Sequence, residues 1–171
     1  MAPDQSDRNN GWAVGVLALA AVWFGILVGV SFIATPAKFL APSLSLPVAL
    51  DVGRHTFAVF NRTEWILSAT LCGLVLFGAR SRLSVIGVVI LVALVLAETV
   101  WLLPLLDSRV GLIIAGQQPA PSNLHMIYIV CEVAKLLSLL LIVIDTAGRL
   151  ASNKQWTTSR PVRSEFNSAD R

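Results

Sequence analysis

The chain has few charged residues and few cysteines. Asp, Glu, Lys and Arg make up only 13% of its 171 residues, whereas soluble domains carry about 25%. Cys72 and Cys131 form no CxxC pair, so nothing indicates a disulfide framework or a zinc site, and we interpret both as buried thiols. The mean hydropathy is +0.75. This composition excludes an ordinary soluble domain and indicates an integral membrane protein.

The basic residues lack the grouping that nucleic-acid binding requires. The isoelectric point is about 9.3, but the net charge is only +3 and Lys and Arg are spread along the chain. No basic stripe with interleaved aromatic residues occurs, so we expect no nucleic-acid partner. The expected partner is the lipid bilayer, and the basic residues are typical of topology signals beside transmembrane helices.

Four apolar runs predict an all-α integral membrane protein that folds as a four-helix bundle. The predicted spans are residues 12–34, 61–79, 83–106 and 124–147, within a membrane domain covering 12–147. The first span contains no charged residue. At about 1.5 Å per residue it exceeds the roughly 30 Å hydrocarbon layer. It is also longer than the apolar core of a signal peptide, so we expect a retained anchor.

The segment between the first two spans is rich in proline. Pro36, Pro42 and Pro47 are expected to break the chain, with Pro47 at the first position of a new helix behind Ser45. Residues 47–60 have the spacing of an amphipathic helix. Such a segment can lie on the membrane surface or extend the second span.

Further turns and small residues indicate how the spans pack. The very short turn at 80–82 predicts that spans two and three are antiparallel neighbours. Pro104 is expected to distort only the last turn of span three, before a polar loop at 107–123. In span one, Gly25 and Gly29 form a G-x-x-x-G. It would let a helix of the same bundle, or of a second copy, approach closely.

The two ends of the chain are predicted to be tails on one side of the membrane. Residues 1–11 form the first tail, and residues 148–171 are rich in Ser, Asn and Arg and are expected to be disordered. The side with the tails would carry Arg8, Arg80, Arg82, Arg149, Lys154, Arg160, Arg163 and Arg171; the other side would carry Lys38, Arg54, Arg62 and Arg109. This excess predicts cytoplasmic termini.

Three ionisable residues, Glu98, Glu132 and Lys135, lie inside the predicted spans. Insertion of such a residue costs about 2.5–3.5 kcal/mol at a helix centre, which the many aliphatic residues of these spans offset. Glu98 and Glu132 each lie about 12 Å from the same membrane boundary. Their carboxylates are therefore expected to face each other at one level. Lys135 lies one helical turn beyond Glu132 on the same face.

Span four carries a polar stripe that includes these residues. His125, Tyr128, Glu132 and Lys135 share one helix face, and we expect this face to point into the bundle because lipid solvates it poorly. Polar residues in or before span two lie toward the same membrane side. The candidate polar cluster is Glu98, His125, Tyr128, Glu132, Lys135, His55, Arg54 and Glu64.

Two interpretations of the cluster stay open. It can be an interhelical ion-pair network that fixes helix register, in a structural or accessory subunit of a membrane assembly. It can equally be an outward-opening pocket, in an oligomer or beside a partner protein, that binds or moves an ion, a proton or a small polar solute. Two carboxylates at one level favour a proton on one of them.

Enzymatic activity has little support in the sequence. No Ser or Cys has a base at a motif spacing, and the Glu-x-x-His pairs of di-iron bundles are absent. His125, His55, Glu98 and Glu132 are acceptable metal-ligand types, but their spacing forms no metal or haem motif. We therefore predict no catalytic residue, no metal and no cofactor.

The stretch GVSFIATPAKFLAPSLSLPVALDVGRHTFAVFNRTE resembles a family of uncharacterised bacterial inner-membrane proteins, and more distantly the transmembrane protein 205-like family. The carrying residues are Gly29, Ser31, Pro36, Lys38, Phe39, Asp51, Gly53, Arg54, Phe57 and Glu64. A second block, NLHMIYIVCEVAKLL, is similar to the family's last helix, although Glu132 stands where the distant relatives tend to have Asn. The resemblance implies a four-helix bundle of the bacterial inner membrane with the polar stripe as a family feature. It implies no activity.

Overall fold

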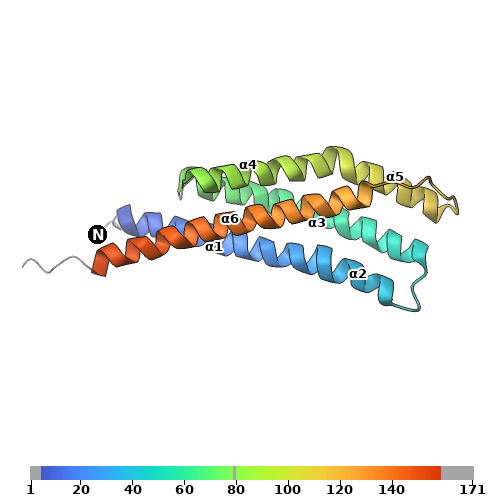
Figure 1. The fold of residues 1–171 in the computed structure, drawn as a ribbon, viewed down its shortest axis with the longest axis horizontal. Coiled ribbons are helices and arrows are strands. Elements are labelled where there is room, and N and C mark those ends of the chain that lie inside the picture. Colours follow the sequence, from blue (N-terminus) through green and yellow to red (C-terminus); the bar gives the residue numbers. More distant parts are fainter. Residues whose placement is uncertain (1–4, 79, 159–171) are drawn as a thin grey trace, which may run out of the picture.

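The computed structural model describes residues 5–78 and 80–158, which form four long helical rods and no strand (Figure 1). The first rod comprises α1 (Gln5–Leu27), the π-helix η1 (Val28–Ala34), α2 (Thr35–Ala37) and the 3-10 helix η2 (Lys38–Leu40). The second rod is α3 (Leu46–Phe77). The third comprises α4 (Arg82–Ala97), the π-helix η3 (Glu98–Leu102) and α5 (Leu103–Ile114), and the fourth is α6 (Leu124–Thr158). The predicted all-helical fold is confirmed for these residues.

Successive rods run in opposite directions. The loops at 41–45 and 115–123 therefore lie at one end of the molecule, which we call the loop end (Figure 1). The start of α1, the turn between α3 and α4, and the end of α6 lie at the other, terminal end. Helix α6 packs against α1 and α4, and α3 packs against α4. The antiparallel pairing of spans two and three, predicted from their short turn, is thus confirmed.

An apolar core fills the space between the rods on the terminal side. Trp23, Leu27, Leu71, Leu91 and Ile142 have no more than 1% of their surface exposed. Helices α4 and α6 approach closely at Gly87, where an added Cβ would lie 2.7 Å from Cγ1 of Ile142. The core thus depends on one glycine for the close contact of these two helices.

The outward faces of the rods are apolar as well. Phe77 is 84% exposed, Leu40 81%, Val100 70% and Ile66 68%, and such a surface is stable in lipid rather than in water. Three segments are long and apolar enough to cross a membrane: Arg8–Leu40, Arg82–Ile114 and Leu124–Ser152. The chain is therefore a multi-pass membrane protein. Helix α3, which carries charged residues midway, is not among the three.

Pro36 was expected to break the chain and Pro104 to distort the last turn of span three, but the helical rods continue past both prolines. Proline lacks an N–H group and its ring collides with the carbonyl four residues earlier. Here each proline follows a π-helical stretch, η1 before Pro36 and η3 before Pro104, whose wider turn accommodates that clash. The first rod continues to Leu40 and the third to Ile114, so the polar loop predicted from Asp107 begins only after Ile114.

The helices also extend beyond other predicted boundaries. Helix α3 begins at Leu46 with Ser45 as N-cap, so Pro47, predicted at the first position, is the second residue of the helix. Residues 47–60 are continuous with the second span. Helix α1 begins at Gln5, inside the predicted tail 1–11. Helix α6 continues to Thr158, inside the predicted tail 148–171, because Leu150 still packs against the core. The disorder predicted for 159–171 lies outside the described residues.

The G-x-x-x-G of the first rod makes no close helix contact in the structure. A Cβ added at Gly25 or at Gly29 would meet nothing within 4 Å, so the prediction that the motif packs within the bundle is wrong. The close approaches occur instead at Gly87 and at Gly78, where an added Cβ would overlap Trp12.

A polar contact fastens α4 to α6 at the terminal end. The Ser81 hydroxyl caps α4 by accepting a hydrogen bond from the backbone N–H of Ser84 at 3.0 Å and also donates to the Asp145 carboxylate. The Ser84 hydroxyl donates to the same carboxylate at 2.7 Å, and Arg149 pairs with it at 3.2 Å. The first turn of α4 is therefore fixed to the last third of α6.

Candidate functional site

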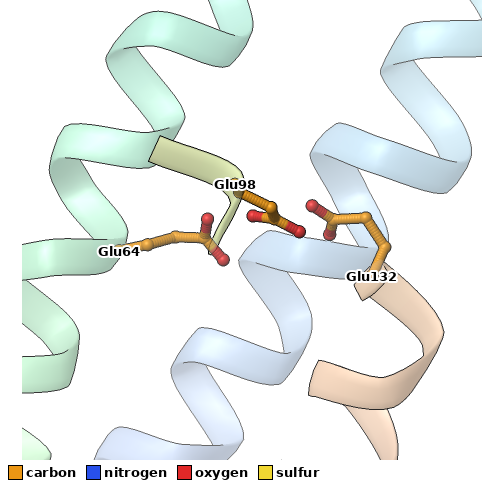
Figure 2. Close-up of side chains that lie close together, drawn as sticks. All are labelled: Glu64, Glu98 and Glu132. Atoms are coloured by element: carbon orange, nitrogen blue, oxygen red, sulfur yellow. The ribbon is translucent and has the colours of Figure 1, made fainter. Parts of the chain in front are cut away.

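The centre of the molecule contains one ammonium group surrounded by three carboxylates. Nζ of Lys135 lies 2.7 and 2.9 Å from the two carboxylate oxygens of Glu64, 2.7 Å from Glu98 and 2.9 Å from Glu132. Figure 2 shows the three glutamates turned toward one another. The exposed fraction of these four side chains is 0–1%. We call these four residues the Lys135 cluster.

Helix periodicity explains how α6 contributes two members. Glu132 and Lys135 lie three residues apart on the face that α6 turns inward, and Tyr128 lies one turn earlier on the same face. All three are buried. The Tyr128 ring packs on Phe57 at 4.9 Å between centroids.

The two π-helical stretches supply further groups to the same level. Glu98 is the first residue of η3, and Ser31 lies within η1, where its hydroxyl donates to Oε2 of Glu132 at 3.1 Å. In α1, Nε1 of Trp23 donates to Oε1 of Glu64 at 3.3 Å. π-Bulges are frequent at functional sites because the wider turn re-aims side chains. All four rods therefore contribute a polar group to the cluster.

The charges of the Lys135 cluster do not balance. Three ionised carboxylates and one ammonium would leave two negative charges at a site with almost no exposure to solvent. Burying an uncompensated charge costs several kcal/mol or more, so groups in such sites tend to become neutral. Oε1 of Glu98 is in addition a buried oxygen without a hydrogen-bond partner in the described part of the chain. The excess of carboxylates and the unpartnered Oε1 of Glu98 therefore allow the cluster to bind a proton.

The three carboxylates have the spacing of a metal site, but their cation is already present. One oxygen of each glutamate lies within 4.8 Å of the others, and oxygen ligands of this kind suit Mg²⁺ or Ca²⁺. The Lys135 ammonium, however, contacts all three carboxylates. A metal ion at this point would have to displace a positive charge that all three glutamates already bind. The geometry therefore favours protons over a metal.

A second group of polar contacts lies nearer the loop end than the Lys135 cluster. The Thr99 hydroxyl donates to Oδ1 of Asn61 at 3.0 Å, and Nε1 of Trp65 donates to the Thr99 oxygen at 3.0 Å. Asn61 is buried, and its Nδ2 has no partner among the described residues. Asn61, Thr99 and Tyr128 also line a cavity of about 720 Å³ at the loop end. Tyr128 thus lines the cavity one helical turn from Glu132 of the Lys135 cluster.

The sequence-predicted site residues divide between these places. Glu64, Glu98, Glu132 and Lys135 come together, with Tyr128 one helical turn from Glu132.

The other predicted residues lie outside the Lys135 cluster. Arg54 and His125 line the cavity instead, and Arg54 pairs with Asp51 at 2.8 Å. His55 is exposed and its ring contacts the Asp51 backbone oxygen at 2.9 Å. Arg62, predicted on the same membrane side, is exposed and also lines the cavity. Neither histidine belongs to the Lys135 cluster.

Sequence reasoning missed the contributions of the first rod. Trp23 lies deep in an apolar span, whereas tryptophan is enriched at the membrane surface. This depth could have predicted a buried hydrogen-bond partner for the indole N–H. Ser31 carried a weaker signal, because serine is common at helix contacts in membranes. The two cysteines, interpreted as buried thiols, are free and only partly buried.

Comparison with family models, with curated proteins and with solved structures finds no match. The resemblance to bacterial inner-membrane proteins and to the transmembrane protein 205-like family therefore stays a prediction.

Proposed function

We propose that this chain is a multi-pass protein of the bacterial inner membrane whose Lys135 cluster binds and releases protons. The observation that carries the proposal is the ratio of charges: three buried carboxylates face a single ammonium. One or more of the carboxylates would be protonated to avoid an uncompensated charge in the membrane. Oε1 of Glu98, which accepts no hydrogen bond among the described residues, is the proposed proton position.

A route for the proton is supported by the position of Tyr128. It lies one helical turn from Glu132 on the inward face of α6, and its side chain lines the loop-end cavity. Hydroxyl and carboxyl groups are able to relay protons. In this proposal the proton enters from the cavity, passes Tyr128 and reaches the Lys135 cluster.

The test is infrared difference spectroscopy on the purified protein in bilayers, stepped between acidic and alkaline pH. We expect a C=O stretching band of a protonated carboxyl that disappears at high pH and returns at low pH. Glu98→Gln should remove or shift this band, whereas Asp51→Asn, a change at a partly exposed carboxylate, should leave it unaltered. If no protonated-carboxyl band titrates while the protein stays folded, the proton-binding proposal is wrong.

A structural role is the second candidate, and a specific observation favours it. The Lys135 cluster links α3, η3 and α6, and Trp23 and Ser31 attach the first rod, so one ammonium holds all four rods in register. Under this account the combined change of Glu64, Glu98 and Glu132 to Gln with Lys135→Met leaves no buried charge unpaired but removes the contacts that hold the rods, so it should lower the unfolding free energy. Changing only Glu132 and Lys135 would leave Glu64 and Glu98 buried without their cation. That variant would therefore not distinguish a structural role from proton binding.

The proposed topology has four spans with both termini in the cytoplasm. Helix α3 is as long as its neighbours and exposes Val59, Ile66 and Phe77 outward, which supports a fourth crossing. The terminal end carries Arg8, Arg80, Arg82 and Arg149, in keeping with the positive-inside rule. Fusions of alkaline phosphatase and green fluorescent protein to each terminus test this topology. Phosphatase activity at either terminus would contradict it.

A further inference from the structure

The loop-end cavity has the size and the walls of a small-molecule site. It lies among the first rod, α3, α5 and the start of α6 and measures about 720 Å³, within the roughly 300–1,000 Å³ of typical ligand pockets. Phe39, Leu50, Phe57, Leu103 and Ile113 are among the apolar side chains that line it. The walls therefore suit an apolar body.

The charged groups around this cavity are mostly cationic. Lys38, Arg54, Arg62 and Arg109 line it, together with one carboxylate, Asp107. Four positive charges and one negative charge leave a net charge of +3. Arg54 is partly neutralised, because it pairs with Asp51 at 2.8 Å and lies 3.7 Å from Asp107.

Lys38 is the cation whose surroundings point most directly to a ligand. Its Nζ lies 5.1 Å from the ring centroid of Phe39 and 5.6 Å from that of Phe57. The side chain is partly buried, and none of the described carboxylates pairs with it. Aromatic faces attract a cation but do not neutralise it. An anion entering the cavity would complete the set of contacts around this ammonium.

We propose that the loop-end cavity binds an anion attached to an apolar chain, with Lys38 as the principal charge partner. The anionic group would lie against Lys38 and Arg62, and the apolar chain would lie along Phe57 and Leu103. Two sources have this chemistry: a free single-chain carboxylate and the headgroup of an anionic phospholipid. The cavity adjoins the Lys135 cluster at Tyr128, but anion binding to Lys38 does not depend on proton binding by the cluster.

Gly53 provides a change that moves the Lys38 ammonium without altering any charge. A Cβ added at Gly53 would lie 2.2 Å from Nζ and 3.4 Å from Cε of Lys38, and would meet no other atom within 4 Å. The flexible lysine can swing away, so Gly53→Ala should displace the ammonium and leave the fold intact. Gly73→Ala is the matched control on the same helix, because a Cβ there meets nothing within 4 Å.

The experiment measures equilibrium binding of radiolabelled dodecanoate to the full chain in phosphatidylcholine nanodiscs, after subtraction of binding to empty nanodiscs. We expect saturable binding that Lys38→Gln and Gly53→Ala each weaken about tenfold, as expected for the loss of a charge-assisted contact. Gly73→Ala should bind like the unaltered chain. Circular dichroism verifies the helical fold of each variant, and the comparison of the two glycine variants decides the matter if Lys38→Gln does not fold.

Competitors identify the chemistry and its source. Dodecanol and dodecyltrimethylammonium, which have the same chain without the negative charge, should not displace dodecanoate. Displacement by phosphatidylglycerol in the nanodisc would identify a phospholipid headgroup as the natural anion, and its failure to displace would identify a free carboxylate; both results support the site. Equal binding of dodecanol, unsaturable binding of dodecanoate, or full binding by Gly53→Ala would overturn the proposal.

Discussion

The Lys135 ammonium in α6 lies 2.7 and 2.9 Å from the two carboxylate oxygens of Glu64 in α3. Both side chains are buried, and the same ammonium also contacts Glu98 and Glu132. The cation is therefore unique within the Lys135 cluster, whereas each carboxylate is one of three. Removing the cation and removing one carboxylate should have very different consequences.

Lys135→Met is expected to destabilise the protein strongly. It leaves three buried carboxylates without their cation, and removal of one partner of a buried ion pair costs about 3–5 kcal/mol. Glu98→Gln keeps the cation and replaces the proposed neutral carboxyl by a neutral amide, so it should change the unfolding free energy by no more than about 1.5 kcal/mol. Both values follow from unfolding titrations with SDS in mixed micelles, monitored by circular dichroism. Equal losses of unfolding free energy in Lys135→Met and Glu98→Gln would contradict the prediction that the single cation matters more than one of the three carboxylates.

Trp23→Phe is predicted to weaken the connection of α1 to the Lys135 cluster. The change removes the indole N–H that donates to Glu64 at 3.3 Å. A hydrogen bond to a charged group contributes about 1.5–3 kcal/mol, and this long one should fall at the lower limit. Trp101→Phe, at a residue that is 51% exposed, is the control and should cost less. The same SDS titration measures both, and a Trp101→Phe loss as large as that of Trp23→Phe would argue against the contact.

The sequence alone predicted the Lys135 cluster in outline. The distance of Glu98 and Glu132 from the ends of their spans predicted one common depth, and helical spacing predicted that Lys135 lies beside Glu132. Both predictions depend only on the regular rise and turn of a helix. Glu64 was included as a further partner, but its central contact with Lys135 depends on the rotation of α3 against α6. Spacing within one helix does not specify that rotation, which side-chain packing between helices determines.

The helix ends and the two π-helical stretches were harder to predict. Proline usually ends a helix in water, whereas in lipid the backbone must stay hydrogen-bonded and the helix continues with a wider turn. Pro36 and Pro104 therefore follow η1 and η3 instead of ending their rods. His55 and Arg54 were grouped with the cluster by membrane side alone. The structure places both nearer the loop end, where they contact Asp51.

Gly87→Ala is expected to separate α4 from α6. The new Cβ would lie 2.7 Å from Cγ1 of the fully buried Ile142 and 3.4 Å from the backbone oxygen of Ser138. Overpacking of a core costs about 1–3 kcal/mol, which exceeds the gain of up to about 1 kcal/mol from replacing glycine in a helix. Gly73→Ala, with open space around it, should instead be neutral or stabilising. Unfolding titrations should therefore show a loss of stability for Gly87→Ala and no loss for Gly73→Ala.

Ser81→Ala is predicted to loosen the start of α4 at the terminal end. The Ser81 hydroxyl accepts from the backbone N–H of Ser84 and donates to the Asp145 carboxylate, so one change removes both a helix cap and a contact between helices. Loss of an N-cap costs about 1 kcal/mol and up to about 2 kcal/mol. We expect a loss in this range by SDS titration, together with faster amide hydrogen exchange in the first turn of α4.

Two further variants distinguish capping from a general effect of losing a hydroxyl. Ser108→Ala removes an exposed hydroxyl that donates only to the Leu105 carbonyl of its own helix, and should change stability little. Ser81→Thr keeps a hydroxyl at the cap and should retain most of the stability. Ser81→Asp can also cap a helix, but it places a second carboxylate against Asp145 and should not rescue the contact. If Ser81→Asp proved as stable as Ser81→Thr, the hydrogen bond to Asp145 would contribute nothing to the junction of α4 with α6.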